Sequence, residues 1–194
     1  MNYADHVAEI KDASAAAEPT LFLKPSSSIV GPGDAIVLPT QSEKVDLEVE
    51  LTIVMGQIAK NISEKDALNY VWGFTVANDV TARDLQHSDQ QWARSKSFDS
   101  FCPIGPWIET DFVPGTQRIF SEVNGEIRQD ATLDQMIFSV ADIVVFVSQV
   151  MTLLPGDVII TGTPAGIGPL IERGNVVVGI DGLGQRTNKV SAKP

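Results

Sequence analysis

Polar and apolar residues alternate along the chain from Val45 to Ile53. A period of two is typical of a β-strand, and it places Glu48 and Glu50 on the same face as Asp46. Neighbours on one face of a strand lie roughly 7 Å apart, so these carboxylates could converge on one ion. The alternative is a solvated face, because one side of a sheet is commonly polar and open to water.

A second run, from Gly73 to Val80, is almost wholly apolar and carries Asp79 near its end. Such a run predicts a buried strand, and a buried carboxylate needs a partner or an ion. Together with Glu48 and Glu50, Asp79 would supply three oxygen ligands and leave positions for water and substrate. Magnesium suits this arrangement, since it takes few protein carboxylates and keeps several waters. The sequence therefore predicts a divalent-metal site at Glu48, Glu50 and Asp79.

The remaining pattern predicts a fold that is mostly β with a few helices (α+β). Asn124-Gly125 is a strong hairpin-turn signal within 119–130. Helices are expected at 64–70, 84–92 and 140–150, the first and last with capping-box patterns that start at Ser63 and Ser139. Further strands are expected at 21–25, 35–39, 158–160, 176–180 and 185–190. This order favours a mixed sheet, sandwich or roll over a doubly wound fold, in a single catalytic domain spanning 1–194.

His6 and Glu9 are three residues apart near the start of the chain. One turn of helix would place them on the same face. A histidine oriented by a carboxylate is the usual form of a general base. The alternative is a solvated pair without function, because chain ends fray.

Composition and charge narrow the classes of protein. The 194 residues are 43% hydrophobic, which is enough for one well-developed core. A net charge of −11 argues against nucleic acid as a partner. The chain has one cysteine, Cys102, and no apolar run of transmembrane length, signal peptide or basic amphipathic segment, so we expect no disulfide, no membrane association and a cytoplasmic location. The glycine-rich segment 161–168 lacks the lysine of a P-loop, which disfavours nucleotide binding.

Taken together, these motifs resemble the fumarylacetoacetate hydrolase family. The resemblance covers nearly the whole chain and rests on the order of many short segments, namely 2–6, 21–25, 48–51, 78–84, 96–99, 123–126, 136–138, 155–158 and 161–166. It implies the mixed β-sandwich roll of that family's C-terminal domain. It also implies a homodimer and a bound magnesium or manganese ion, with calcium as a substitute in crystals.

The resemblance also implies a role for each site residue. Glu48, Glu50 and Asp79 match the family's metal ligands. His6 and Glu9 match a catalytic dyad on a mobile lid, which would occupy residues 1–18. Lys96 matches a catalytic and substrate-binding lysine, and Arg83 is expected to be structural. Further contacts with the carboxylate and keto oxygens of the substrate are expected from Gln86, Gly162 and Thr163.

The implied activity is hydrolysis of a carbon–carbon bond in acylpyruvate-type 1,3-diketo acids, such as fumarylpyruvate or acetylpyruvate, through a metal-stabilised pyruvate enolate. The His6–Glu9 dyad favours hydrolysis, which needs an activated water. Three alternatives stay open: an oxaloacetate decarboxylase, a 2-hydroxyhepta-2,4-diene-1,7-dioate isomerase, and an inactive metal-binding paralogue. Specificity for the substrate tail is expected to come from residues 10–20 and 84–95.

The chain departs from the family pattern at its start. Members usually carry a strand and a glycine turn before the segment that matches 2–6, whereas here Met1 precedes it directly. We therefore expect the lid to be truncated on its N-terminal side. Equal turnover by an N-terminally extended chain would contradict that expectation.

Overall fold

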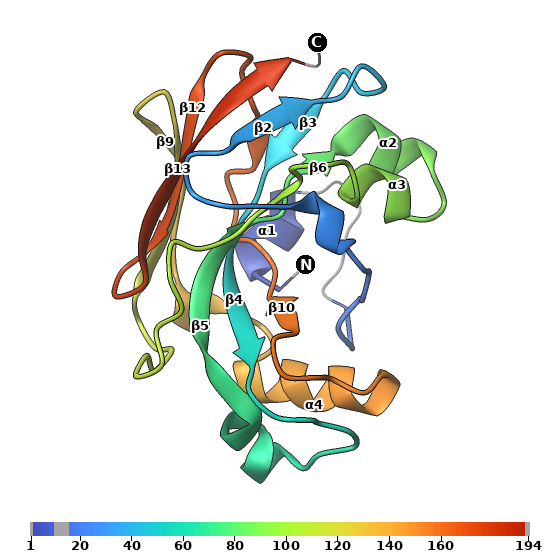
Figure 1. Ribbon diagram of the computed structural model, residues 1–194, viewed down its shortest axis with the longest axis vertical. Helices are drawn as coiled ribbons and strands as arrows, with labels where there is room; N and C mark the ends of the chain where they lie inside the picture. Colours follow the sequence, from blue (N-terminus) through green and yellow to red (C-terminus); the bar gives the residue numbers. More distant parts are fainter. Residues whose placement is uncertain (1, 10–15, 193–194) are drawn as a thin grey trace.

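The computed structural model describes residues 2–9 and 16–192, and its largest sheet has five strands in the order β2-β13-β12-β8-β9. Neighbouring strands in this sheet are antiparallel except β2 and β13, which are parallel. The sheet forms one side of the molecule (Figure 1). Its strands are β2 (Ala35–Leu38), β8 (Arg118–Val123), β9 (Glu126–Thr132), β12 (Asn175–Ile180) and β13 (Gly184–Ala192).

A three-stranded antiparallel sheet lies beside it and carries part of the predicted site. Its order is β10-β4-β5, from β4 (Val49–Met55), β5 (Val71–Asn78) and β10 (Val158–Ile160). Successive side chains of a strand point to opposite faces, so β4 directs Leu51 into the core and Glu50 away from it. Valines of β12, Val176 and Val178, belong to the same core cluster. The two sheets therefore share one hydrophobic core.

Two small sheets complete the β-structure. One has the order β11-β3-β6, from β3 (Val45–Leu47), β6 (Thr81–Ala82) and β11 (Gly168–Pro169), and the other pairs β1 (Ile29–Val30) in parallel with β7 (Cys102–Pro103). The strand predicted from Val45 is thus interrupted at Glu48, between β3 and β4. Both of its faces are buried, with Glu48 and Glu50 only 4% and 3% exposed. The solvated-face alternative is therefore wrong.

Short helices surround the sheets, and they place the walls of the site. Helices α2 (Arg83–Ser88) and α3 (Ala93–Lys96) lie near one end of the molecule, and α4 (Val140–Val150) lies near the other (Figure 1). Helix α1 (Ala4–Glu9) lies between these two ends. The 3-10 helices are η1 (Ser26–Ser28), η2 (Glu64–Tyr70) and η3 (Leu133–Gln135).

Several predicted elements are confirmed. The hairpin joins β8 to β9 through Asn124 and Gly125, which both have positive φ as such a turn requires. Helix α4 begins after Ser139, whose hydroxyl accepts from the Asp142 amide while the Asp142 carboxylate accepts from the Ser139 amide. The strands predicted at 35–39, 158–160, 176–180 and 185–190 correspond to β2, β10, β12 and β13. The mostly β character with a few helices is confirmed as well.

Three predicted elements need correction. Residues 64–70 form a 3-10 helix, and Ser63 does not cap it, because its hydroxyl donates to the Asp66 carboxylate at 2.6 Å. The helix predicted at 84–92 is shorter, because α2 covers only Arg83–Ser88, and the next helix, α3, begins at Ala93. Residues 21–25 form no strand, since none of the described residues pairs with them in a ladder, and Lys24 instead contacts Asp79, which follows β5.

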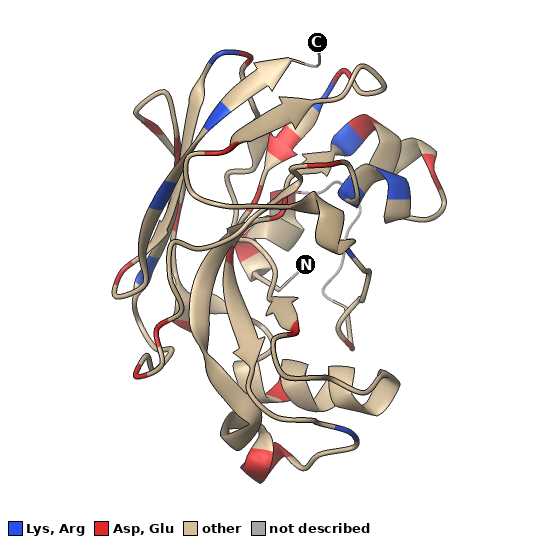
Figure 2. Cartoon of the chain, in the orientation of Figure 1, with Lys and Arg blue, Asp and Glu red and all other residues tan. Residues whose placement is uncertain are grey.

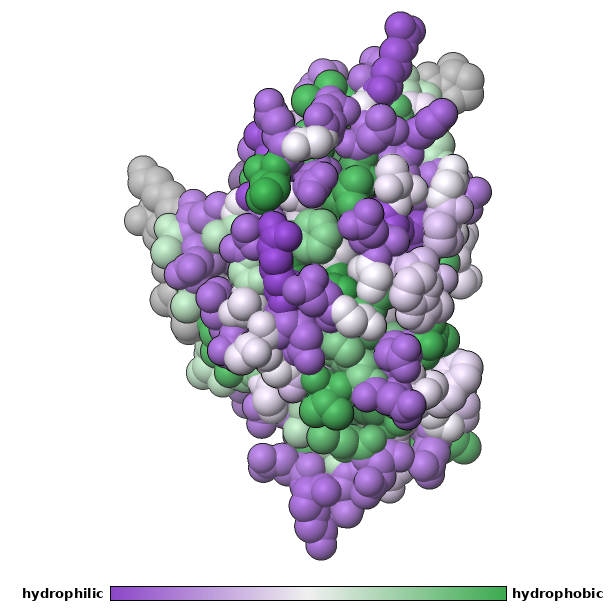
Figure 3. Space-filling model, turned by 90° about the vertical axis from the view of Figure 1, so that its left-hand side faces the viewer, coloured by the Kyte–Doolittle hydropathy of each residue, from purple (hydrophilic) through white to green (hydrophobic). Residues whose placement is uncertain are grey.

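Charge and hydrophobicity are unevenly distributed over the surface. Acidic residues are scattered over most elements, whereas basic residues gather around α2, α3 and β13 (Figure 2). On the face turned outward by the five-stranded sheet, hydrophobic residues gather between hydrophilic ones (Figure 3). None of the helices described in the structure combines the length and apolar character that a bilayer crossing requires.

Candidate active site

Three buried carboxylates meet where β3, β4 and β5 come together. Glu48 joins β3 to β4, Glu50 lies in β4, and Asp79 follows β5. Ligand oxygens of the three side chains all lie within 4.8 Å of one another. The backbone fixes this arrangement, because the Asp79 amide donates to the Glu48 carbonyl at 2.8 Å and the Glu48 amide donates to the Asn78 side chain at 2.9 Å. The predicted triad is thus assembled, although its role as a metal site stays a prediction.

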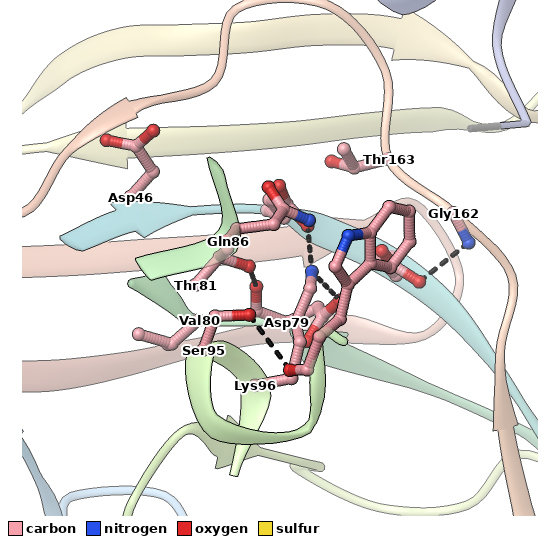
Figure 4. Close-up of polar contacts among 12 residues, drawn as sticks. Asp46, Asp79, Val80, Thr81, Gln86, Ser95, Lys96, Gly162 and Thr163 are labelled. Carbon is pink, nitrogen blue, oxygen red and sulfur yellow. Dashed lines mark hydrogen bonds and ion pairs between the residues drawn. The ribbon is translucent and has the colours of Figure 1, made fainter. Parts of the chain in front are cut away.

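Two lysines bind the triad from the side of α3. The Lys96 ammonium donates to Glu48 Oε2 at 2.9 Å and to Asp79 Oδ2 (Figure 4). The Lys24 ammonium donates to Asp79 Oδ1 at 2.7 Å and to the Lys96 carbonyl at 2.5 Å. Both oxygens of Asp79 therefore accept from a lysine. Lys24 was not among the predicted site residues.

Arg83 binds the triad from α2. Its Nε donates to Asp46 Oδ2 at 2.9 Å, and its Nη2 donates to Glu48 Oε1. The predicted structural pairing of Arg83 with nearby acids is therefore confirmed. Its Nη1 donates to Gln86 Oε1 at 2.6 Å, which fixes a residue predicted to bind substrate.

Burial and neighbouring charges shift the pKa values of Glu48 and Glu50 in opposite directions. Burial alone would raise the pKa of Glu48, but the charges and hydrogen bonds of Lys96 and Arg83 outweigh it and lower the pKa to about 2. For Glu50, burial and the charges of Asp79 and Glu48 raise the pKa to about 8. Burial would lower the pKa of Lys96, but Asp79 and Glu48 together hold it above its usual value.

The donor set fits a hard divalent cation. Glu50 is the one triad member without an ion-pair partner among the described residues, and its Oε2 accepts only the Gly162 amide, at 2.6 Å. A buried carboxylate without a cation is costly, and a divalent ion on the triad would neutralise it. Carboxylate oxygens are the ligands that magnesium, manganese and calcium prefer. The three residues would hold such an ion.

The predicted dyad is formed at the edge of the same site. His6 Nδ1 lies 3.1 Å from Glu9 Oε2, and Glu9 Oε1 accepts the Gly166 amide at 2.7 Å. His6 is only 4% exposed, so the alternative of a solvated pair is wrong for the histidine. Because Nδ1 faces Glu9, Nε2 is the ring nitrogen left to act on a proton.

Asn2 docks the start of the chain onto the site. Its amide nitrogen donates to the Thr161 carbonyl at 2.9 Å, and its amide oxygen accepts the Phe138 amide at 2.7 Å. Gly162 permits this approach, because it has a φ of +97° and a β-carbon there would lie 2.7 Å from the Asn2 β-carbon. Glycine at 162 therefore serves both the docking of Asn2 and the amide contact with Glu50.

A cavity of about 260 Å³ collects the predicted residues. Its lining includes His6, the three triad residues, Gln86, Lys96, Gly162 and Thr163, whereas Glu9 is not part of the lining. The Thr163 hydroxyl donates to the Val49 carbonyl at 2.8 Å and accepts from Gln129 at 2.7 Å. Contact of Gln86, Gly162 and Thr163 with substrate stays a prediction.

The loops predicted to set specificity reach this cavity in part. Pro19, Thr20, His87 and Trp92 belong to the lining, while 10–15 of the predicted segment 10–20 lie outside the described residues. The Trp92 ring packs edge-on against Phe22 at 5.7 Å between centroids, and Lys96 Nζ lies 4.8 Å from the Phe22 ring centre.

Two buried polar residues escaped the sequence-based prediction. Lys24 lies in a segment that matched the family pattern, and its position between apolar residues and a proline was the available signal. Gln129 links β9 to the site, because its amide accepts from the Val49 amide and donates to Thr163 and the Pro164 carbonyl. No pattern marks Gln129, since it stands among polar residues of a largely exposed strand.

Comparison with known proteins connects this site to a family. The sequence model of the fumarylacetoacetate hydrolase C-terminal family matches residues 1–191 of this chain. The mitochondrial oxaloacetate tautomerase of Homo sapiens is 46% identical over 202 residues, which covers 98% of this chain and 64% of the human protein. A protein of Methanocaldococcus jannaschii without an assigned function is 48% identical, over 98% of this chain and 80% of its own.

Solved structures of enzymes share the fold. The 2-hydroxyhepta-2,4-diene-1,7-dioate isomerase of Mycobacterium marinum is 46% identical with a TM-score of 0.92, over 100% of this chain and 72% of its own. The fumarylpyruvate hydrolase of Pseudomonas aeruginosa, solved with Mn²⁺ and pyruvate, is 32% identical with a TM-score of 0.92, over 99% of this chain and 87% of its own. The family match spans nearly the whole chain, and the buried carboxylate triad lies within it. The chain therefore belongs to the fumarylacetoacetate hydrolase family.

Proposed function

We propose that the protein is a divalent-metal-dependent hydrolase that cleaves a carbon–carbon bond in acylpyruvate-type 1,3-diketo acids. The observation that carries the proposal is the meeting of two functional groups in one cavity. The buried His6, which faces the more exposed Glu9, supports an activated water, and the triad with Lys96 supports a site for a 2-oxo acid. Magnesium or manganese is the proposed ion.

The triad would hold the ion through Glu48, Glu50 and Asp79. When bound, such an ion supplies a Lewis acid that polarises the oxygens of a chelated 2-oxo acid. Lys96 adds a fixed positive charge beside the position where negative charge develops, and burial strengthens its effect. Arg83 holds Gln86 and Glu48 in place through its three contacts.

His6 performs the proton transfers in this proposal. Its Nε2 takes a proton from water, and the resulting hydroxide oxygen bonds to the acyl carbonyl carbon. The bond between that carbon and C3 of the pyruvate unit then breaks, and its electron pair passes into the pyruvate enolate. The imidazolium returns its proton to C3, which gives a carboxylic acid and pyruvate. Glu9 orients the ring throughout, and Gly166 orients Glu9.

A second candidate acts on oxaloacetate at the same site. The 46% identity with the human oxaloacetate tautomerase favours keto–enol interconversion or decarboxylation of that acid. These reactions need the same chelating head group, but they need no attacking water. The isomerase relationship supports a third reaction of the same kind, moving a proton rather than breaking a bond with water.

A coupled assay of pyruvate release separates the candidates. Acetylpyruvate and oxaloacetate are supplied side by side with Mg²⁺ or Mn²⁺, to the protein and to a His6→Ala variant, and oxaloacetate tautomerisation is followed separately by its ultraviolet absorbance. Cleavage of acetylpyruvate that is lost in the variant supports the hydrolase. Reaction of oxaloacetate alone, retained in the variant, supports the second candidate. Metal binding without any turnover supports an inactive paralogue.

A further inference from the structure

The cavity has two chemically different ends. Its charged residues come from the triad and from α2 and α3, near one end of the molecule. Its other wall is built from Ile143 of α4, Ile160 of β10, and Phe138, which precedes α4. Figure 1 shows α2 and α3 on the opposite side of β10 from α4. The cavity therefore passes from a charged end to an apolar end.

The register of β4 and β10 gives the distance between the two ends. Ile160 pairs with Thr52, which lies two positions beyond Glu50 on the same face of β4, whereas Ile159 pairs with Ile53 on the face that packs against the core. At about 3.3 Å per residue, the apolar wall begins roughly 7 Å from the triad. This distance corresponds to a tail of several carbon atoms attached to a head group held at the triad.

The cationic groups of the described lining are already engaged at the charged end. Lys96 is paired with Glu48 and Asp79, and Arg83 is paired with Asp46 and Glu48. Of the two histidines, His6 faces Glu9, and His87 lies on α2 at the charged end. In the described part of the lining, the wall formed by α4 and β10 contains no cation that could neutralise a second carboxylate. A charged tail would lose its hydration there without compensation.

We infer that the substrate carries, beyond its 2-oxo acid head, an uncharged apolar tail held against Phe138, Ile143 and Ile160. This inference rests on the proposed function for the position of the head group. It narrows the substrate class to monocarboxylic 2-oxo acids with alkyl or acyl tails. Dicarboxylic acids of equal length would be poor ligands.

A matched pair of non-reacting ligands tests the inference by calorimetry on the Mn²⁺-loaded protein. The ligands are 2-oxohexanoate and 2-oxoadipate, which both have six carbons and differ in a terminal methyl group against a terminal carboxylate, with pyruvate as the reference head group. Each buried methylene contributes about fourfold in affinity, so we expect 2-oxohexanoate to bind at least tenfold more tightly than pyruvate. We expect 2-oxoadipate to bind no more tightly than pyruvate.

A charge placed on the apolar wall should reverse this preference. Ile160→Lys is expected to bind 2-oxoadipate more tightly than 2-oxohexanoate. The matched control is Val158→Lys, two residues earlier on the same strand and outside the lining, which should keep the wild-type order. Pyruvate affinity reports whether the charged end is intact in each variant.

The outcomes distinguish the inference from the proposed function. Tight binding of 2-oxoadipate by the unaltered protein would overturn the apolar-tail inference and leave the 2-oxo acid head in place. Binding of none of the three acids would overturn the proposed function, and this inference with it. A preference for 2-oxohexanoate in the unaltered protein supports both.

Discussion

At the scale of single residues, the charge balance around the triad explains how three carboxylates remain buried together. Lys96 and Lys24 use both oxygens of Asp79, and Lys96 with Arg83 uses both oxygens of Glu48. Glu50 lacks such a partner among the described residues and has the raised pKa. The site is thus electrostatically incomplete at Glu50, which is where a divalent ion would be most stabilising.

Replacing Lys96 with methionine should destabilise the metal-free protein. Loss of the buried ammonium leaves Glu48 and Asp79 short of compensation, so we expect the free energy of unfolding to fall by about 3–5 kcal/mol. Because a divalent ion would restore the balance, Mn²⁺ should raise the free energy of unfolding of this variant more than that of the unaltered protein. Urea unfolding with and without Mn²⁺ measures both effects.

The control is Lys189→Met, at an exposed position of β13, which should change the free energy of unfolding little. An equal loss with and without Mn²⁺ would contradict the expected compensation.

Replacing Glu9 with glutamine should reduce turnover without affecting the metal. The amide keeps a group that can accept from Gly166 but removes the charge that stabilises a protonated His6. We expect kcat for acetylpyruvate cleavage to fall at least tenfold, toward the value of His6→Ala. The Mn²⁺ dissociation constant from calorimetry should stay within twofold, because Glu9 lies outside the triad. A weakened Mn²⁺ affinity would instead assign Glu9 a role in shaping the metal site.

At the scale of elements, two serines that carry the same sequence signal behave differently. Ser139 forms a reciprocal capping box with Asp142 at the start of α4. The Ser63 hydroxyl donates to the Asp66 side chain, at the start of the 3-10 helix η2, while the Asp66 amide donates to the Ser63 carbonyl. The short pattern is the same, but only α4 presents the free amide at the third helical position that a capping box needs.

Ser139→Ala should therefore cost more stability than Ser63→Ala. Loss of the cap of α4 is expected to lower the free energy of unfolding by about 0.5–2 kcal/mol. Ser63→Ala removes one exposed contact between side chains and should change it by less than about 0.5 kcal/mol. Chemical denaturation of both variants compares them directly. Equal losses would mean that the capping box of α4 contributes nothing.

The elements that could be predicted from the sequence are those specified by local chemistry. The Asn124-Gly125 hairpin, α4 and the strands β2, β10, β12 and β13 follow from turn residues, caps and periodicity. The strand predicted at 21–25 is wrong because Leu21 and Phe22 line the cavity, where Phe22 packs against Trp92, instead of pairing with a strand. The site residues were predicted from their spacing in the sequence and from the family resemblance. Lys24 and Gln129 were missed, because the partners that tie them to the site, Asp79 and Thr163, are distant in the sequence.

At the scale of the whole molecule, protonation of Glu50 links metal binding to pH. With a pKa near 8, Glu50 holds its proton more tightly in the folded metal-free protein than at its usual value of 4.5. Its contribution to stability is therefore fully present below about pH 4.5 and is lost as the pH rises toward 8. Glu48, with a pKa near 2, stays ionised across that range.

Affinity for Mn²⁺ should accordingly weaken as the pH falls below about 8. The ion has to displace the proton of Glu50, so we expect the dissociation constant to rise by up to about tenfold for each pH unit between 8 and 6. Calorimetry at several pH values should also detect proton release. Glu50→Gln should bind more weakly and lose this pH dependence. A pH-independent dissociation constant for the unaltered protein would contradict the assignment of Glu50 as a ligand.

The homodimer that the family resemblance implies also stays a prediction for the whole molecule.

The contacts of Asn2 and Glu9 join the first residues of the chain to positions 159 and 157 residues further on. During synthesis on the ribosome, Glu9 gains its contact with the Gly166 amide only after residue 166 has left the exit tunnel. The pocket is therefore completed only after the segment that carries Gly162 and Thr163 has emerged, whichever parts of the sheets fold earlier. Pairing between such distant positions is slow to form. A nascent chain would be unable to hold Glu9 and Asn2 in their places until that later segment has been made.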